Sequence, residues 1–178
     1  MSEFLDDEFR QMEERELEEE MEIQEAVSIK DPISSLELQK MVVVESDTTV
    51  ASVIELFQAE RVACVLVSEK GTLLGIFTER DVIMKLAGKG LDYSKEAVND
   101  YMTKSPNVLR SDDPITFALN RMTEGGYRHV PIVDSQGKPE GLVGILDIIR
   151  HLAVYYSDEV LNLPPEPQRG AQERPEGG

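Results

Sequence analysis

Two short turns contain the residues of this sequence whose types and spacing could do chemistry. One is Gly75-Ile-Phe-Thr-Glu-Arg-Asp81, and the other, 66 residues further along, is Gly141-Leu-Val-Gly-Ile-Leu-Asp147. Each starts with a glycine and places an aspartate at the expected start of a helix. A helix start presents backbone N–H groups to an anion, and a carboxylate can accept hydrogen bonds from two adjacent hydroxyls of a ribose. The pattern predicts recognition of an anion and a sugar.

A purely structural interpretation of both turns is also open. Thr78 is a good N-cap residue, and an aspartate in the first turn of a helix complements the helix dipole. Either turn alone favours capping. Ligand binding is therefore favoured over capping only if residues outside these turns also suit a ligand.

The remaining reactive residues do not predict catalysis or a metal site. Cys64 lies in an apolar strand with no base nearby in the sequence, which is typical of a core thiol. His129 and His151, with a single cysteine, do not form a zinc-binding set. No nucleophile, base and orienting group occur together. We expect a protein that is not an enzyme and needs neither a metal nor a cofactor.

The helices that would position these turns occur twice. Apolar residues at the spacing of one helix face recur about 65 positions apart: Val50, Val53, Ile54 and Phe57, then Ile115, Ala118, Leu119 and Met122. Asp113 is expected to cap the second of these helices, with Pro114 at its first position.

Strand patterns surround both helices. Runs at Met41–Val44 and Asn107–Leu109 precede them, and runs at Cys64–Val67 and Val130–Val133 follow. Turns ending in Gly71 and Gly137 lead to a third strand, and a second helix follows in each copy. The inward residues expected on these helices are Val82, Ile83 and Leu86, then Ile148, Ile149 and Leu152. The repeating unit is β-α-β-β-α, with one extra residue near Gly125-Gly126.

Charge and composition limit the possible partners and compartment. The net charge is −17, and residues 1–26 alone carry 12 acidic and 2 basic side chains. Such a chain repels nucleic acid. It contains no apolar run of about 18 residues and no signal peptide, and its one cysteine fits a reducing cytosol, so we expect a cytoplasmic protein without membrane contact. Residues 1–26 are expected to form a charged helix, either a solvated arm or a dimer-packing or partner-binding helix.

In combination, these motifs resemble a tandem pair of CBS domains, the regulatory modules named after cystathionine β-synthase. Gly75–Asp81 matches the family's glycine–hydrophobic–any–Thr/Ser–any–any–Asp motif, while Tyr127–Asp134 and Val98–Thr103 resemble a strand and a linking segment of the family. The resemblance covers residues 34–156. It implies an α/β (α+β) fold of two β-α-β-β-α domains packed by pseudo-twofold symmetry, with an N-terminal helical arm. The expected divisions are an acidic arm at 1–33, domains at 34–90 and 91–157, and a disordered tail at 158–178.

The resemblance also implies a ligand, an adenosine-containing nucleotide such as AMP, ADP or ATP bound between the domains. Asp81 would hold the ribose hydroxyls, Thr78 would reach a phosphate or the ribose, and Arg128 with His129 would face the phosphate. The full set implied for this first cleft is Ile76, Thr78, Asp81, Pro106, Asn107, Tyr127, Arg128 and His129.

A second, weaker cleft is implied around the other turn. Its residues would be Met41, Val62, Ala63, Val143, Gly144 and Asp147. Gly144 stands where the family has a hydroxyl, and Val62-Ala-Cys64 offers no positive charge. This cleft is expected to be empty, weak or specific for an uncharged nucleoside.

The expected function is therefore a regulatory module that binds a nucleotide and signals by a conformational change. We expect a homodimer and a separate, unidentified target protein. The alternative is a dimerisation or interaction module that binds no nucleotide.

Overall fold

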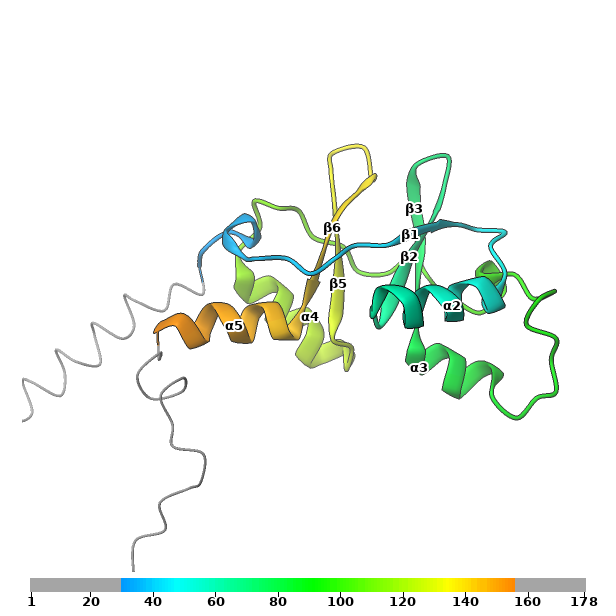
Figure 1. Cartoon of the computed structure of the whole chain (residues 1–178). Helices are drawn as coiled ribbons and strands as arrows, with labels where there is room; N and C mark the ends of the chain where they lie inside the picture. Colours follow the sequence, from blue (N-terminus) through cyan, green and yellow to red (C-terminus); the bar gives the residue numbers. More distant parts are fainter. Residues whose placement is uncertain (1–29, 156–178) are drawn as a thin grey trace, which may run out of the picture. The chain divides into compact units, whose positions relative to one another are not determined.

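The computed structural model describes residues 30–155, so the predicted arm at 1–26 and tail at 158–178 lie outside the described residues. The first copy contains β1 (Val43–Glu45), α2 (Val50–Glu60), β2 (Cys64–Glu69), β3 (Thr72–Thr78) and α3 (Glu79–Asp81), which continues as the π-helical turn η2 (Val82–Leu86) (Figure 1). The second contains β4 (Thr103–Lys104), α4 (Ile115–Gly125), β5 (His129–Val133), β6 (Pro139–Gly144) and α5 (Ile145–Tyr155). One short 3-10 turn precedes each copy: η1 (Ile33–Ser35) lies before β1, and η3 (Val98–Asp100) lies before β4.

The predicted helix faces are buried. Val50, Val53 and Phe57 of α2 are in the core of the first copy, and Ile115, Ala118 and Met122 of α4 are buried in the second. Gly126 ends α4 in a left-handed conformation with φ 65°, as the glycine pair near this position predicts. Apolar periodicity thus located both helices.

The capping prediction for α4 is wrong. Pro114 occupies the N-cap position with extended dihedrals, and no side chain caps the helix. The carboxylate of Asp113 instead accepts the backbone N–H of Arg110 at 2.8 Å. Asp113 therefore stabilises the turn before the helix.

The first copy forms a four-stranded sheet in the order β1-β2-β3-β4. β2 is parallel to β1 and antiparallel to β3, and its first five residues are buried, because it lies inside the sheet. In the second copy β5 and β6 form an antiparallel pair. The strand predicted at Asn107–Leu109 is reduced to a single parallel bridge between Leu109 and Ile132.

The segment that leads into each copy packs against the other copy. Thr49, which caps α2, forms a bridge with Ala97, while Pro114 at the start of α4 forms a bridge with Pro32. β4 pairs with β3, so the beginning of the second copy extends the sheet of the first. This reciprocal exchange brings residues far apart in the sequence to the same turns.

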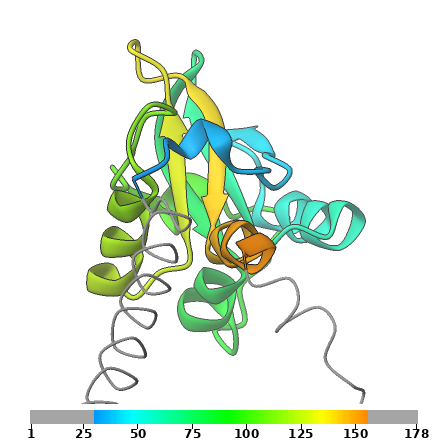
Figure 2. The ribbon, with the colours of Figure 1, turned by 90° about the vertical axis from the view of Figure 1, so that its left-hand side faces the viewer.

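Apolar side chains also join the two hairpins. Leu142 of β6 packs with three residues of the first sheet, Cys64, Leu66 and Ile76. At the hairpin tips, the backbone N–H of Leu73 donates to the carbonyl of Gly137. The hairpins, teal and yellow in Figure 2, therefore lie side by side.

Two residues predicted to face inward are exposed. Ile83 is 67% exposed and Ile149 is 51% exposed, whereas Leu86 and Ile148 are fully buried. Side chains of adjacent helix residues point about 100° apart, so when Ile148 faces the core its neighbour Ile149 points away from it.

Within residues 30–155, every helix is too short or too polar to cross a lipid bilayer.

Candidate functional site

Thr78 and Asp81 hold each other where β3 enters α3. The Asp81 carboxylate accepts the Thr78 backbone N–H at 2.9 Å and the Thr78 hydroxyl at 2.7 Å, both at Oδ2. In return, Thr78 Oγ1 accepts the backbone N–H of Asp81 at 3.2 Å. This is a capping box, so the structural interpretation of the turn is confirmed. Capping still leaves acceptor positions on the carboxylate, which has about four.

Lys85 fixes the other oxygen of Asp81. Its ammonium group lies 2.7 Å from Asp81 Oδ1 and also donates to the carbonyl of Tyr101 at 2.6 Å. Asp81 is only 9% exposed, and a charge that deep requires such partners. The carboxylate is therefore held in one orientation before any ligand arrives.

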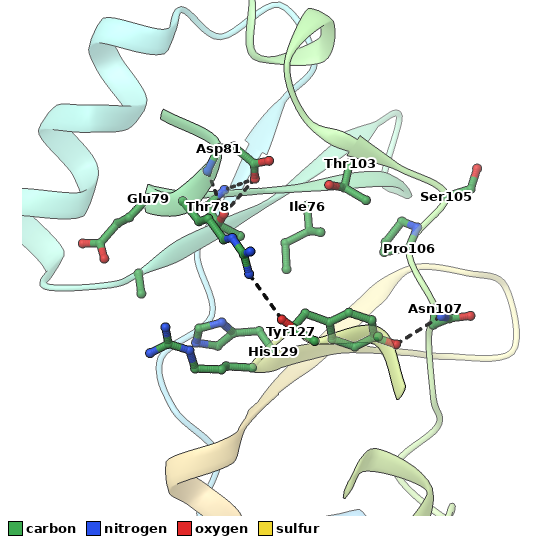
Figure 3. A pocket seen from close by; sticks show the side chains of 15 residues that line it. Ile76, Thr78, Glu79, Asp81, Thr103, Ser105, Pro106, Asn107, Tyr127 and His129 are labelled. Atoms are coloured by element: carbon green, nitrogen blue, oxygen red, sulfur yellow. Dashed lines mark hydrogen bonds between the residues drawn. The ribbon is translucent and has the colours of Figure 1, made fainter. Parts of the chain in front are cut away.

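A cavity of about 590 Å³ opens beside this turn. Residues of both copies line it (Figure 3). Its lining includes all eight residues proposed for the first cleft: Ile76, Thr78, Asp81, Pro106, Asn107, Tyr127, Arg128 and His129. The volume lies within the range of about 300–1,000 Å³ that is usual for small-molecule sites. We call this space the first cavity.

Tyr127 forms a wall opposite Asp81. Its hydroxyl accepts a hydrogen bond from Asn107 Nδ2 at 3.1 Å, shown as a dashed line in Figure 3. The ring lies against the backbone of Gly125, where any Cβ atom would overlap it. Gly125 thus leaves the room that the ring needs.

The first cavity carries charges of both signs. Arg80 and Arg128 line it together with Glu79 and Asp81, and Arg80 Nη1 makes a long contact of 3.4 Å with the carbonyl of Gly126. Arg80 therefore bridges from the first copy to the end of α4 in the second.

Sequence reasoning missed several lining residues, of which Arg80 is the most consequential. A cation in the first turn of a helix opposes the helix dipole, and this local misfit is a signal that could have identified it. The lining residues not proposed for this cleft are Ala63, Glu79, Arg80, Thr103, Ser105, Gly125 and Gly126.

Burial sets the protonation of two groups near the cavity. It lowers the pKa of His129 below its usual value, Arg128 lowers it further, and the carboxylates of Asp147 and Glu79 act in the opposite direction. His129 is thus neutral near pH 7. Burial, with the charge of Glu79, raises the pKa of the Cys64 thiol to about 12, which excludes a thiolate nucleophile at that position.

The second turn keeps its aspartate but has a different environment. Asp147 Oδ2 accepts the backbone N–H of Gly144 at 2.7 Å, and Asp147 is 3% exposed. Of the other residues proposed for the second cleft, Met41 packs among apolar side chains between the hairpins and Val62 packs on the core of the first copy. Val143 is buried in β6, and Ala63 lines the first cavity.

The arrangement suits binding of a polar, anionic molecule with an apolar part. It combines a fixed carboxylate, two guanidinium groups, an aromatic ring and the apolar side chains of Ile76 and Pro106. Among residues 30–155, no cluster of histidine, cysteine, aspartate and glutamate is placed to hold a metal ion.

Comparison with known sequences agrees with this architecture. The CBS domain model matches residues 33–88 and 98–154. A protein of Acidianus ambivalens described as an uncharacterized 17.7 kDa protein is 31% identical over 121 residues, 67% of this chain and 72% of that protein. CBS domain-containing protein CBSCBSPB5 of Arabidopsis thaliana is 33% identical over 121 residues, which cover 67% of this chain but only 21% of the plant protein.

Solved structures give the same result. An uncharacterized conserved protein from Pyrococcus horikoshii has a TM-score of 0.63 and 26% identity, covering 69% of this chain and 92% of that one. The crystal structure of CBSX2 in complex with AMP has a TM-score of 0.59 and 26% identity, covering 71% and 98%. The chain therefore belongs to the CBS domain family and carries two CBS domains in tandem.

Proposed function

We propose that the first cavity binds an adenosine-containing nucleotide, such as AMP, ADP or ATP, as a regulatory ligand. One observation carries this proposal: a fixed carboxylate from one domain and a guanidinium from the other, those of Asp81 and Arg128, line the same cavity of about 590 Å³. A nucleotide has both a diol and an anion for such a pair.

The ribose fits the Thr78–Asp81 pair. Oδ2 of Asp81 already accepts two hydrogen bonds from Thr78, whereas Oδ1 contacts only Lys85 and can accept one further bond from a ribose hydroxyl. The Thr78 hydroxyl donates to Asp81 and accepts the Asp81 N–H, so one lone pair of its oxygen is left for a ligand. That lone pair suits a ribose hydroxyl and not a phosphate oxygen, so of the two roles expected for Thr78 we favour the ribose.

The phosphate fits the arginines. Arg128 forms no hydrogen bond or ion pair through its side chain within residues 30–155, and Arg80 makes only the long contact with Gly126. Both guanidinium groups can therefore turn toward an anion, and their planar forks suit phosphate oxygens. His129, being neutral, would contribute a hydrogen bond without charge.

The base fits the apolar surfaces. Ile76 and Pro106 line the cavity across from the ring of Tyr127 (Figure 3). An adenine ring could pack between them, with Asn107 at its edge. The solved structure of CBSX2 in complex with AMP, 26% identical to this chain, supports an adenine nucleotide as the first ligand to test.

Binding would act on the arrangement of the two domains. The ligand would touch the α3 turn of the first domain and the α4–β5 connection of the second, so its affinity would differ between arrangements of the pair. A difference of that kind is what a ligand needs in order to shift a conformational equilibrium. A target protein that recognises one arrangement would then respond to the nucleotide.

A thermal-shift panel of adenine and guanine nucleotides tests the proposal. A nucleotide that binds only the folded chain raises Tm with concentration, because stabilisation grows as the logarithm of ligand concentration over Kd. We expect AMP, ADP or ATP to raise Tm. If every nucleotide left Tm unchanged at millimolar concentration, the alternative of a module without a nucleotide would be preferred.

We also propose that the chain forms a homodimer. Ile83 and Met84 of η2 are 67% and 70% exposed, and Leu146 at the start of α5 is 59% exposed. A second copy of the chain would bury these apolar side chains if they met in one interface. Sedimentation should give twice the 20.0 kDa chain mass, and a monomer at high concentration would refute this.

A further inference from the structure

The side chain of Gln39 fills the space beside Gly144 in the second domain. A Cβ atom built on Gly144 would lie 2.5 Å from Gln39 Nε2 and 3.2 Å from Gln39 Cδ. The same point lies 3.3 Å from Asp147 Oδ2. The carboxamide of Gln39 therefore lies where the second turn lacks the hydroxyl side chain found in the first.

A comparison of the two domains shows that this placement follows from their reciprocal packing. Met102 lies against Gly75 in the first domain, and Leu38 lies against Gly141 in the second. The following residues, Thr103 and Gln39, thus occupy corresponding places. Thr103 is short and lines an open cavity, whereas Gln39 is long and reaches the turn.

Nothing in the described chain hydrogen-bonds the buried end of this side chain. Gln39 Nε2 has no partner within residues 30–155 and no contact with solvent. An amide in that condition loses the hydrogen bonds that water would give it, which is unfavourable. No hydrogen bond from Nε2 within residues 30–155 therefore holds the carboxamide in this space.

We propose that Gln39 is an internal plug that occupies the second cleft in place of a nucleoside. Removing the plug opens a site for an uncharged nucleoside beside Asp147. In the repeat, Val62 and Ala63 correspond to Arg128 and His129 of the first cavity, so neither of those positions offers a cation or a hydrogen-bonding side chain to a phosphate. The inference rests on the proposed function only for the choice of adenosine as the probe.

Calorimetric titration with adenosine tests the plug through a difference between variants. Gln39→Ala should bind one more adenosine per chain than the unmodified chain does. Glu37→Ala, an exposed neighbour on the same segment, should bind the same number as the unmodified chain. If Gln39→Ala and the unmodified chain bound equal numbers, the proposal would be overturned.

A variant with a shorter amide side chain distinguishes the effect of side-chain length from the effect of the amide group. Gln39→Asn keeps the carboxamide but cannot reach Gly144, so it should gain the same extra site as Gln39→Ala. If Gln39→Asn kept the stoichiometry of the unmodified chain, the amide group and not its position would matter, and the plug would be refuted.

The two proposals fail separately in this experiment. If the unmodified chain did not bind AMP, the proposed function would be refuted and the plug would not be affected. The plug is judged only by the number of adenosines gained on shortening Gln39, whether the unmodified chain starts from none or from one.

Discussion

The two Gly–Asp turns of this chain have the same hydrogen bond between aspartate and backbone, and they differ in their surroundings. In both, the aspartate accepts the backbone N–H of the residue three positions before it, from Thr78 in the first domain and Gly144 in the second. Only the first turn adds a hydroxyl, from Thr78, an arginine directly before the aspartate, Arg80, and an arginine across the cavity, Arg128. The aspartate is therefore part of the fold in both domains, and what surrounds it decides whether the turn can also bind a ligand.

The largest expected effect concerns the glycine that starts each turn. A Cβ atom at Gly75 would meet Met102 and lie 2.8 Å from the backbone carbonyl of Thr103, whereas one at Gly141 would meet only the end of Leu38 at 2.9 Å. A side chain can move aside more easily than a backbone. Gly75→Ala should lower the free energy of unfolding by about 2 kcal/mol, and Gly141→Ala by about 1 kcal/mol or less. Chemical denaturation measures both, and an equal loss would contradict the comparison.

The next effect is the contribution of the arginine charges to the binding of AMP. Arg128→Ala should weaken AMP binding about tenfold, roughly 1.4 kcal/mol, and leave adenosine binding unchanged, because the guanidinium acts on the phosphate. Arg80→Ala should act in the same direction. Calorimetry with both ligands measures this. Arg121→Ala, an exposed arginine on α4, is the matched control and should change neither affinity.

A smaller effect tests the hydroxyl that the second turn lacks. Thr78→Ala removes the N-cap and should cost about 1 kcal/mol of stability, while Thr78→Ser keeps the hydroxyl and most of that stability. Thermal unfolding of both variants measures the difference. Equal losses from serine and alanine would show that the methyl group, and not the cap, holds the turn.

The smallest effect is a dependence on pH. Burial lowers the pKa of His129 in the folded chain, so below the usual pKa of 6.5 the unfolded chain binds a proton that the folded chain does not. Stability is therefore lost as the pH falls through that value and is fully present above it. The unmodified chain should lose stability relative to His129→Gln between pH 7 and pH 5. Chemical denaturation of both chains at pH 7 and pH 5 measures this. An equal difference in unfolding free energy between the two chains at both pH values would contradict the prediction.

Much of the site was predictable because it follows local patterns. Apolar periodicity located α2 and α4, the glycines located the turns, and the family resemblance named eight residues that line one cavity. The periodicity and the turn glycines are signals within a few consecutive residues. The eight cavity residues lie in three separate segments, and the family resemblance supplied the way in which these segments pack together.

The missed features depend on packing between distant segments. Arg80 lines the first cavity and contacts the carbonyl of Gly126, which lies 46 residues further along the chain. Ala63 lines the first cavity and not only the second cleft. These outcomes follow from the exchange of leading segments between the domains, which no single stretch of the sequence records.

The central claim is that a nucleotide binds at Asp81 and that Asp147 serves the fold. Calorimetric titration of AMP into Asp81→Ala and Asp147→Ala tests it most directly, with circular dichroism to confirm that both variants are folded. Loss of charge-assisted hydrogen bonds worth about 1.5–3 kcal/mol should weaken AMP binding to Asp81→Ala by more than tenfold. Asp147→Ala should bind AMP as the unmodified chain does. If Asp147→Ala abolished binding while Asp81→Ala kept it, the nucleotide site would lie in the second domain and the account would be wrong.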